Sequence, residues 1–385
     1  MKEYDVIIIG AGIAGSGLAY NLNKECPEKK VLIIDAKEPG SNASYGYRNI
    51  MESLQKEYNF PYEHMYKGMK IGIEDKIFFT LNRKFYFINY KKICNKLLRE
   101  SKAEFKKGFA KEFNSKILKT DKECYKFKYL VDCSGSSFFI KKKLRHKLPF
   151  RYWMAKTRVL KNELKDKDYY YYQFHDSGYF EDIYPLKNKT LQGDWQYTEK
   201  RDLNLLKPIE NQLYKKLISK PKIIKEYIVG NPCTPVLPLV YKNIAFLGDS
   251  FGNPVTSSAC GIKPILDTSK ILSKAIKKNN LKLYEKEWKK RYLEIYIRYL
   301  VPKYYTYHKL KYFQKFKKPT SWFKLIEQFE KYPELFETMF DGEKQFKLPK
   351  ETKKIFHKSS KIFQGAYYIY LKYKYYKMSK FYRIN

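Results

Sequence analysis

The chain has 385 residues, of which 44% are hydrophobic, enough for a large buried core divided into two or three structural parts. Its 78 Lys and Arg against 40 Asp and Glu give a formal net charge of +38, and it also contains 38 Tyr and 26 Phe. Such a surface favours contact with nucleic acid, anionic lipid or an acidic protein, because a strong positive field concentrates all three. A second interpretation is compositional drift in an AT-rich genome, which enriches Lys, Tyr, Phe, Ile and Asn together.

Several classes of protein are excluded by what the sequence lacks. The sequence contains no run of about 20 apolar residues that could span a bilayer. Acidic residues and glycines interrupt the N-terminal apolar run, which argues against a signal peptide. The six cysteines are scattered without a Cys-x-x-Cys pair, so neither a zinc site nor a disulfide framework is indicated. We expect a cytoplasmic, reduced, metal-free protein.

The first forty residues predict a strand, a glycine turn and a helix. The apolar run at residues 6–9 has the length and β-branching of a buried parallel strand, and Gly10, Gly12 and Gly15 follow it in G-x-G-x-x-G spacing. In this pattern Gly10 permits the tight turn, Gly12 lets the backbone approach a pyrophosphate, and Gly15 lets the helix of residues 13–23 pack on the strand. The N-terminus of that helix presents N–H groups and a positive dipole end to the phosphates.

A second strand, residues 31–35, ends at Asp35. This acid lies about 20 positions after Gly15, where a carboxylate accepts hydrogen bonds from ribose hydroxyls. Strand, helix, second strand and acid together predict a dinucleotide site. The alternative is a parallel β-α-β unit without a ligand, in which Asp35 is a solvated carboxylate.

The following segments are expected in chain order. Alternating apolar segments predict antiparallel strands within residues 60–88, and Asn89 predicts the cap of a helix. Residues 128–137 predict a short buried strand and a small-residue turn, and residues 151–230 contain several Tyr-rich, strand-like runs. Residues 243–277 return to the opening pattern of strand, loop and helix, and the remainder is mostly helical in period.

Three separated segments resemble the motifs of a known group of flavoproteins. The GAGIAG unit, the VDCSGSS turn and the FLGDSFGNP…CGI segment occur in the order of the flavin-contacting motifs of two-domain FAD enzymes, which include aromatic hydroxylases, halogenases, lycopene cyclases and geranylgeranyl reductases. The resemblance implies that Asp249 binds the ribityl chain and that Gly261 and Ile262 offer backbone N–H groups near the flavin ring. The expected FAD contacts are Gly10, Gly12, Ala14, Gly15, Asp35, Gly46, Arg48, Gly135, Gly248, Asp249, Gly261 and Ile262.

Within this group the chain most resembles the archaeal geranylgeranyl reductases, in outline over about residues 1–280. FEDIYP at 180–185 resembles a loosened form of their substrate-cavity motif, and SYGYR at 44–48 takes the place of their Cys-Gly pair. The chain departs from the pattern where Asp182 replaces an aromatic residue and where Tyr45 replaces the cysteine. The TSSAC segment, which ends at Cys260, also departs from the usual small-residue loop.

The resemblance implies reduction of the C=C bonds of an isoprenoid chain, in membrane lipid synthesis. Such a reaction needs an apolar pocket and one positioned acid, for which Asp182, Tyr45 and Cys260 are the candidates. Asp182 needs burial to raise its pKa toward neutrality. The alternatives to a role as proton donor are that Asp182 is an exposed loop aspartate, that Tyr45 only stacks or packs, and that Cys260 is a small packing residue.

The implied fold class is α/β, with a Rossmann-like FAD-binding domain, an inserted antiparallel β-sheet substrate domain and a C-terminal helical region. The expected boundaries are residues 1–59, 89–145 and 231–280 for the discontinuous FAD-binding domain, 60–88 and 146–230 for the substrate domain, and 281–385 for the helical region.

Partners and rival functions remain open. Only one glycine fingerprint is present, so electrons are expected from a transient donor, either a ferredoxin or a reduced nicotinamide. The basic and aromatic C-terminal region suits peripheral contact with an anionic membrane, and the alternative is a helical lid with solvated lysines. Other possible functions are an FAD monooxygenase or halogenase of a small aromatic, and a basic RNA- or membrane-binding protein without catalysis. No nucleic-acid motif accompanies the charge, so nucleic acid is not the expected partner.

Overall fold

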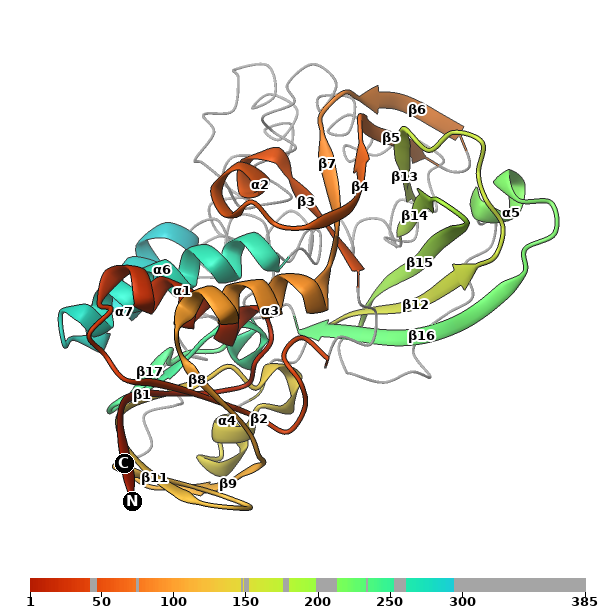
Figure 1. Cartoon of the computed structure of the whole chain (residues 1–385). Helices are drawn as coiled ribbons and strands as arrows, with labels where there is room; N and C mark the ends of the chain where they lie inside the picture. Colours follow the sequence, from red (N-terminus) through yellow and green to blue (C-terminus); the bar gives the residue numbers. More distant parts are fainter. Residues whose placement is uncertain are drawn as a thin grey trace, which may run out of the picture.

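A computed structural model defines the fold up to residue 293 (Figure 1). It describes residues 1–293 except 42–46, 74–75, 147, 149–151, 176–179, 199–212, 233–234 and 253–260. The predicted site residues Tyr45, Gly46 and Cys260 therefore lie outside the described residues, as does most of the expected helical region at 281–385.

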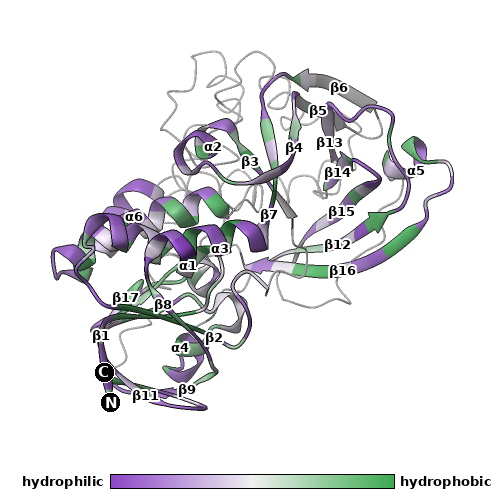
Figure 2. Ribbon diagram, in the orientation of Figure 1, coloured by the Kyte–Doolittle hydropathy of each residue, from purple (hydrophilic) through white to green (hydrophobic). Residues whose placement is uncertain are grey.

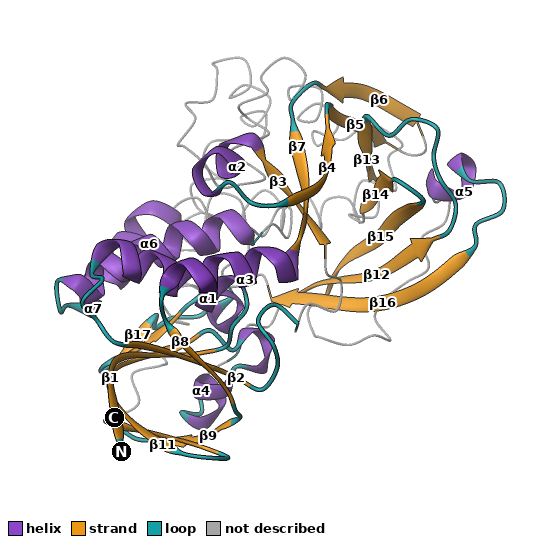
Figure 3. Cartoon of the chain, viewed as in Figure 1, coloured by secondary structure: helices purple, strands orange, loops and turns teal. Residues whose placement is uncertain are grey.

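Within these residues the strands form three sheets, distinguished from the helices by colour in Figure 3. The largest sheet contains β1 (Lys2–Ile9), β2 (Val31–Asp35), β8 (Glu104–Lys107), β9 (Ala110–Phe113), β10 (Ile117–Thr120), β11 (Cys124–Asp132), β17 (Val240–Tyr241) and β18 (Ile244–Phe246). The second contains β5 (Gly68–Ile73), β6 (Lys76–Leu81), β12 (Tyr152–Leu160), β13 (Tyr169–Phe174), β14 (Phe180–Leu186), β15 (Lys189–Thr198) and β16 (Ile223–Pro232). The third contains β3 (Tyr47–Met51), β4 (Tyr62–Tyr66) and β7 (Phe85–Asn89).

The helices complete the described part of the chain. They are α1 (Ile13–Glu25), α2 (Glu52–Tyr58), α3 (Tyr90–Ser101), α4 (Phe139–Lys143), α5 (Leu213–Leu217), α6 (Ile262–Lys277) and α7 (Leu281–Trp288), with short turns η1 (Gly135–Ser137), η3 (Gly248–Phe251) and η4 (Lys289–Leu293). The predicted cap of α3 is confirmed, because the Asn89 side chain accepts a hydrogen bond from the N–H of Lys92 at 3.2 Å. None of the described helices is long and apolar enough to cross a membrane.

The opening of the chain forms a parallel β-α-β unit because an apolar strand is followed by a helix and a second apolar strand. Hydrophobic colours mark β1 and β2 in Figure 2, and the apolar run that ends β1 is buried. Ile9 is level with Ile34 of β2 and with Asp132 of β11, and Asp132 is level with Phe246 of β18. The carboxyl ends of four strands therefore meet at one edge, where open α/β sheets bind their ligands.

Helices α1, α3, α6 and α7 lie together on one side of the β1–β2 sheet (Figure 1). Helix α6 approaches α1 closely, since a Cβ on Gly17 would lie 2.5 Å from Leu266 Cδ2. The amide of Asn21 also donates to Ser269 Oγ at 2.7 Å. These contacts fix the N-terminus of α6 beside that of α1.

The second sheet differs from expectation in one pairing. Its strands from residues 152–198 and 223–232 are antiparallel, as predicted, and so is the β5–β6 pair. Strand β5, however, pairs in parallel with β13, far away in the sequence. Strands β4 and β7 join β3 in the third sheet, which lies between the helices and the second sheet (Figure 1). The fold class is therefore as predicted: α/β, a Rossmann-like domain with an inserted and mainly antiparallel sheet.

Candidate functional site: a nucleotide edge facing an aromatic sheet

The turn after β1 can be built only with glycine at two positions. Gly10 has a φ of +107°, and a Cβ there would lie 2.3 Å from the carbonyl oxygen of Cys133. A Cβ on Gly15 would lie 1.9 Å from the carbonyl oxygen of Gly10. Both neighbours are main-chain atoms, which cannot rotate away as a side chain would. The turn and the helix behind it are thus packed against each other as the glycine pattern predicts.

Gly12 has a different role, because it leaves the start of α1 open. It is the N-cap of α1 and has no side-chain cap hydrogen bond. Among the described atoms only Tyr90 Oη lies within 4 Å of a Cβ placed there, at 3.1 Å. The same hydroxyl accepts a hydrogen bond from the N–H of Ile13 at 3.0 Å. Tyr90 was not predicted as a site residue: its helix could be predicted from Asn89, but its position over α1 follows from the tertiary packing.

Asp35 lies beside the glycine turn, as predicted. Its Oδ2 accepts a hydrogen bond from the N–H of Ala11 at 2.7 Å, and its Oδ1 accepts one from the N–H of Lys37 at 2.9 Å. The residue is 8% exposed, so the alternative of a solvated carboxylate at the strand end is wrong. A carboxylate held in this way is fixed in orientation at the edge of the turn.

The second and third motifs meet at Asp132, the last residue of β11. Its carboxylate accepts hydrogen bonds from the N–H groups of Ser134 and Ile140, both at 2.9 Å, and so shapes the turn that contains Gly135. Burial raises its pKa, although these bonds oppose the shift. Its main-chain oxygen accepts from Ser250 Oγ at 2.6 Å, and thereby ties this turn to the Gly-Asp segment.

The third motif also contacts the first. Gly248 has a φ of +75°, and a Cβ there would lie 2.8 Å from the Cβ of Ala14 in α1. Asp249 follows in η3 and is partly exposed. Gly261 is the N-cap of α6 and Ile262 its first residue. The three motifs predicted to share one cofactor are therefore assembled around the start of α1.

Arg48 is placed only in part. Its main chain lies in β3, paired with Ile88, and its side chain is outside the described part of the structure.

The groups at this edge fit FAD. Backbone N–H groups at an uncapped helix start suit a diphosphate, and the buried carboxylate of Asp35 suits a ribose. The Tyr90 hydroxyl accepts a hydrogen bond from the N–H of Ile13 and lies beside Gly12 at this helix start. A Cβ at Gly12 would lie 3.1 Å from the Tyr90 hydroxyl, at the helix start that a phosphate would approach.

The second sheet presents aromatic rings on one face, which we call the aromatic face. The side chains that share it by register and ring contact are Trp153, Tyr170, Tyr172, Phe180, Tyr184 and Trp195. The third sheet packs against it, since the ring of Phe87 lies 5.4 Å from that of Tyr184 and the ring of Tyr66 lies 5.4 Å from that of Tyr170. In this face the predicted substrate motif supplies alternate residues of β14.

Asp182 lies in the middle of the aromatic face. It is 7% exposed, so it is not the exposed loop aspartate of the alternative interpretation. Its Oδ2 accepts hydrogen bonds from the Tyr184 hydroxyl at 3.0 Å and from Trp195 Nε1 at 2.9 Å. Sequence reasoning missed Gly193, where a Cβ would lie 2.4 Å from Asp182 Oδ1. A glycine inside a strand is the signal that another group approaches closely.

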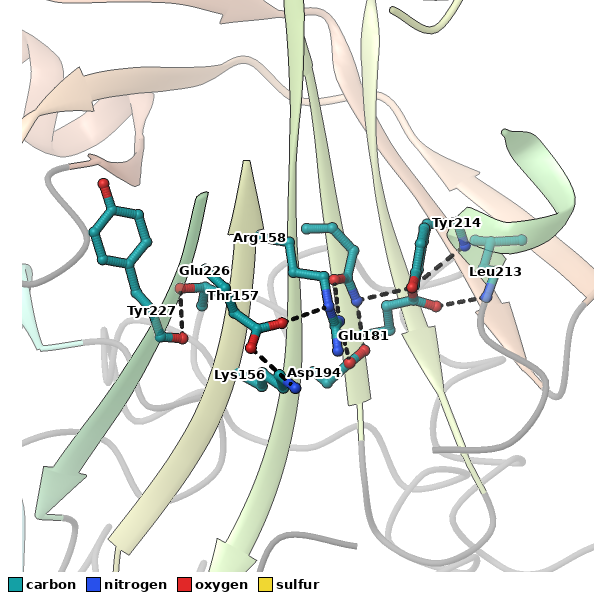
Figure 4. A network of polar contacts seen from close by, with 10 residues as sticks. Lys156, Thr157, Arg158, Glu181, Asp194, Leu213, Tyr214, Glu226 and Tyr227 are labelled. Atoms are coloured by element: carbon teal, nitrogen blue, oxygen red, sulfur yellow. Dashed lines mark hydrogen bonds and ion pairs between the residues drawn. The ribbon is translucent and has the colours of Figure 1, made fainter. Parts of the chain in front are cut away.

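The opposite face of the same sheet holds a network of charged side chains around the buried Asp194 (Figure 4). Arg158 Nη1 donates to Asp194 Oδ2 at 2.5 Å, and Arg158 Nε lies 3.2 Å from Glu226 Oε2. Asp194 is 4% exposed, and burial raises its pKa while Arg158 opposes the shift. This network stabilises the sheet on the side away from the aromatic face.

Glu181 links this network to helix α5 (Figure 4). Its carboxylate accepts from the N–H of Leu213 at 2.6 Å, from the N–H of Tyr214 at 3.3 Å and from Gln192 Nε2 at 3.1 Å. Burial, followed by the nearby charge of Asp194, raises the pKa of Glu181 to about 8. Adjacent residues of β14 therefore serve opposite faces: Glu181 fixes α5, and Asp182 faces the aromatic rings.

Comparison with known proteins identifies the cofactor. Residues 5–113 match the family model described as FAD dependent oxidoreductase. A curated Acinetobacter protein, "Probable FAD-binding monooxygenase AlmA", is 54% identical over 37 residues, which are 10% of this chain and 7% of that protein. The chain thus spans only a small part of this curated relative. FAD is the cofactor that these similarities indicate, in agreement with the glycine turn and Asp35.

Two solved structures share the fold over most of the chain. A geranylgeranyl bacteriochlorophyll reductase-like protein from Thermoplasma acidophilum is 16% identical, with a TM-score of 0.67 over 88% of this chain and 98% of that one. The flavin-dependent brominase Bmp2 is 15% identical, with a TM-score of 0.63 over 81% of this chain and 90% of that one. The chain has the two-domain flavoprotein fold, which it shares with this reductase-like protein and with this brominase.

Proposed function

We propose that this chain is an FAD-dependent oxidoreductase that reduces C=C bonds of an isoprenoid chain. The observation that carries the proposal is the buried carboxyl group of Asp182 within the aromatic face, where aromatic rings surround it. The reductase-like fold neighbour supports it. When bound, FAD supplies the hydride that such a reduction requires.

The other requirements fall on residues of this chain. Reduction of an isolated double bond needs a proton at the second carbon and exclusion of water from the first. The rings of the aromatic face would hold the chain and exclude water. Asp182 would deliver the proton, with Tyr184 and Trp195 fixing the carboxyl group by their hydrogen bonds to Oδ2. Tyr45 and Cys260 remain candidate proton donors outside the described residues.

A test follows reoxidation of the flavin. The bound flavin is reduced anaerobically and mixed with a geranylgeranyl lipid or, as the matched control, with its fully saturated counterpart. The proposal expects reoxidation with the unsaturated lipid only, accompanied by loss of double bonds measured by mass spectrometry. A protein that is purified without flavin and binds RNA with steep salt dependence would instead support the non-catalytic alternative.

Asp182→Asn separates the role of the acid from that of the pocket. We expect the variant to keep its flavin and its lipid affinity but to reoxidise about 10²-fold more slowly, because proton transfer by a positioned group contributes about that factor. Tyr172→Phe, which keeps a ring on the same face, is the control variant and should retain the rate. An unchanged rate in Asp182→Asn would remove Asp182 from the mechanism.

A monooxygenase or halogenase is the second candidate. It is supported by the brominase neighbour and by the polar Asp182 and Trp195 pair, which could bind a small aromatic substrate. This function expects oxygen-dependent consumption of reduced nicotinamide, and no reoxidation by prenyl lipid under anaerobic conditions.

A further inference from the structure

One buried amide in the third sheet has no hydrogen-bond partner among the described residues. Neither Nδ2 nor Oδ1 of Asn49 has a hydrogen-bond partner in the described structure, although both atoms are buried. Buried amides in folded proteins are almost always hydrogen-bonded, because an unmade bond costs stability. A donor and an acceptor left together in one side chain are the feature that a bound ligand would satisfy.

The register of the third sheet shows where this amide points. Asn49 in β3 is paired with Phe87 in β7, so the two side chains share one face of the sheet. Phe87 contacts Tyr184 of the aromatic face, with ring centroids 5.4 Å apart. Ile50, the next residue along β3, is instead buried in the hydrophobic core that includes β1 and β2. Asn49 therefore lies on the side of β3 that faces the second sheet.

The aromatic face of the second sheet lies opposite Asn49 and indicates which kind of ligand group suits the amide. The carboxyl group of Asp182 is buried among the rings on that face and is hydrogen-bonded to Tyr184 and Trp195. A phosphate there would need a cation to pair with its charge, and none of the residues named on the two faces is one. A hydroxyl is neutral, and it can donate to Oδ1 of Asn49 and accept from Nδ2.

We propose that Asn49 binds the hydroxyl of an isoprenoid alcohol, so that the substrate enters as a neutral hydroxyl-bearing chain and not as a phosphate ester. This inference rests on the proposed function and names its substrate class. Asn49 is a specificity-determining residue in this scheme, and the residues named on the two faces offer no cation to the anionic form.

The test compares Asn49→Leu with Met51→Leu. Met51 is paired with Phe85 and so lies on the same face of β3, which makes it a matched control. Binding is followed by the absorbance change of the flavin on addition of geranylgeraniol, its methyl ether or its phosphate. The wild type should bind the alcohol at least tenfold more tightly than the other two, and Asn49→Leu should lose that preference while Met51→Leu keeps it.

The stability of the ligand-free protein is a second readout. Asn49→Leu removes a buried, unsatisfied amide, so its Tm should rise by about 2 °C, whereas replacing an amide with a structural role would lower it. A lower Tm with an unchanged preference for the alcohol would overturn the inference. So would a wild type that binds the ether or the phosphate as tightly as the alcohol. If no prenyl compound perturbs the flavin at all, it is the proposed function that fails.

Discussion

Single atoms decide the role of each glycine at the nucleotide edge. A Cβ on Gly15 would meet the main-chain oxygen of Gly10 at 1.9 Å, whereas a Cβ on Gly12 would meet only the hydroxyl end of Tyr90 at 3.1 Å. The contact at Gly15 is part of the packing between the turn and helix α1. The contact at Gly12 lies at the edge of the space that a phosphate would enter. The same sequence pattern therefore contains one glycine for folding and one for binding.

Gly15→Ala and Gly12→Ala should separate these two roles. We expect Gly15→Ala to lower the free energy of unfolding by about 1–3 kcal/mol, because the main chain must move to admit the methyl group. Gly12→Ala should change the stability of the apoprotein by less than about 1 kcal/mol but weaken FAD binding more than tenfold. Calorimetry of the apoprotein and fluorescence titration with FAD measure the two effects. Equal losses of stability in both variants would contradict this division.

At the scale of elements, strand β14 connects two different environments through neighbouring residues. Glu181 fixes the start of α5 on one face, and Asp182 faces the aromatic rings on the other. The alternation of a strand predicts that adjacent side chains diverge, but not which face receives the rings. That outcome depends on the third sheet, which packs through Phe87 against Tyr184.

Glu181 should give the protein a measurable pH dependence of stability. Its pKa rises from 4.5 to about 8 on folding, so the folded state holds the proton more tightly. The stabilisation is complete below pH 4.5 and is lost as the pH rises through about 8, at up to about 1.4 kcal/mol for each pH unit. Glu181→Gln cannot titrate, so its Tm should fall less than that of the wild type across this window.

The control for this experiment is Glu226→Gln. Glu226 belongs to the same network but its side chain is 37% exposed, so solvent screens its charge. This variant should keep the slope of the wild type. Parallel curves for wild type and Glu181→Gln would show that another group causes the dependence.

At the scale of the whole molecule, the nucleotide edge could be predicted and the substrate side only in part. The site from Gly10 to Asp249 was predictable because parallel strands end at one edge, so that distant motifs converge. Tyr90, Gly193 and Asn49 were not, because their roles depend on contacts with segments far away in the chain. The pairing of β5 with β13 was also not predictable, because it joins strands far apart in the chain. The predicted domain boundaries remain predictions.

The net charge of +38 bears on the electron donor, which we propose to be transient. A basic protein attracts an acidic donor over distances comparable to the Debye length, about 10 Å at 0.1 M salt, so the association slows as salt is added. We expect flavin reduction by an acidic ferredoxin to slow at least tenfold between about 0.02 M and 0.5 M NaCl. Reduction by NADH, a much smaller anion, should respond less, and dithionite controls for direct effects of salt on the flavin. A ferredoxin rate that does not change with salt would mean that the positive surface has no part in electron delivery, as compositional drift alone would produce.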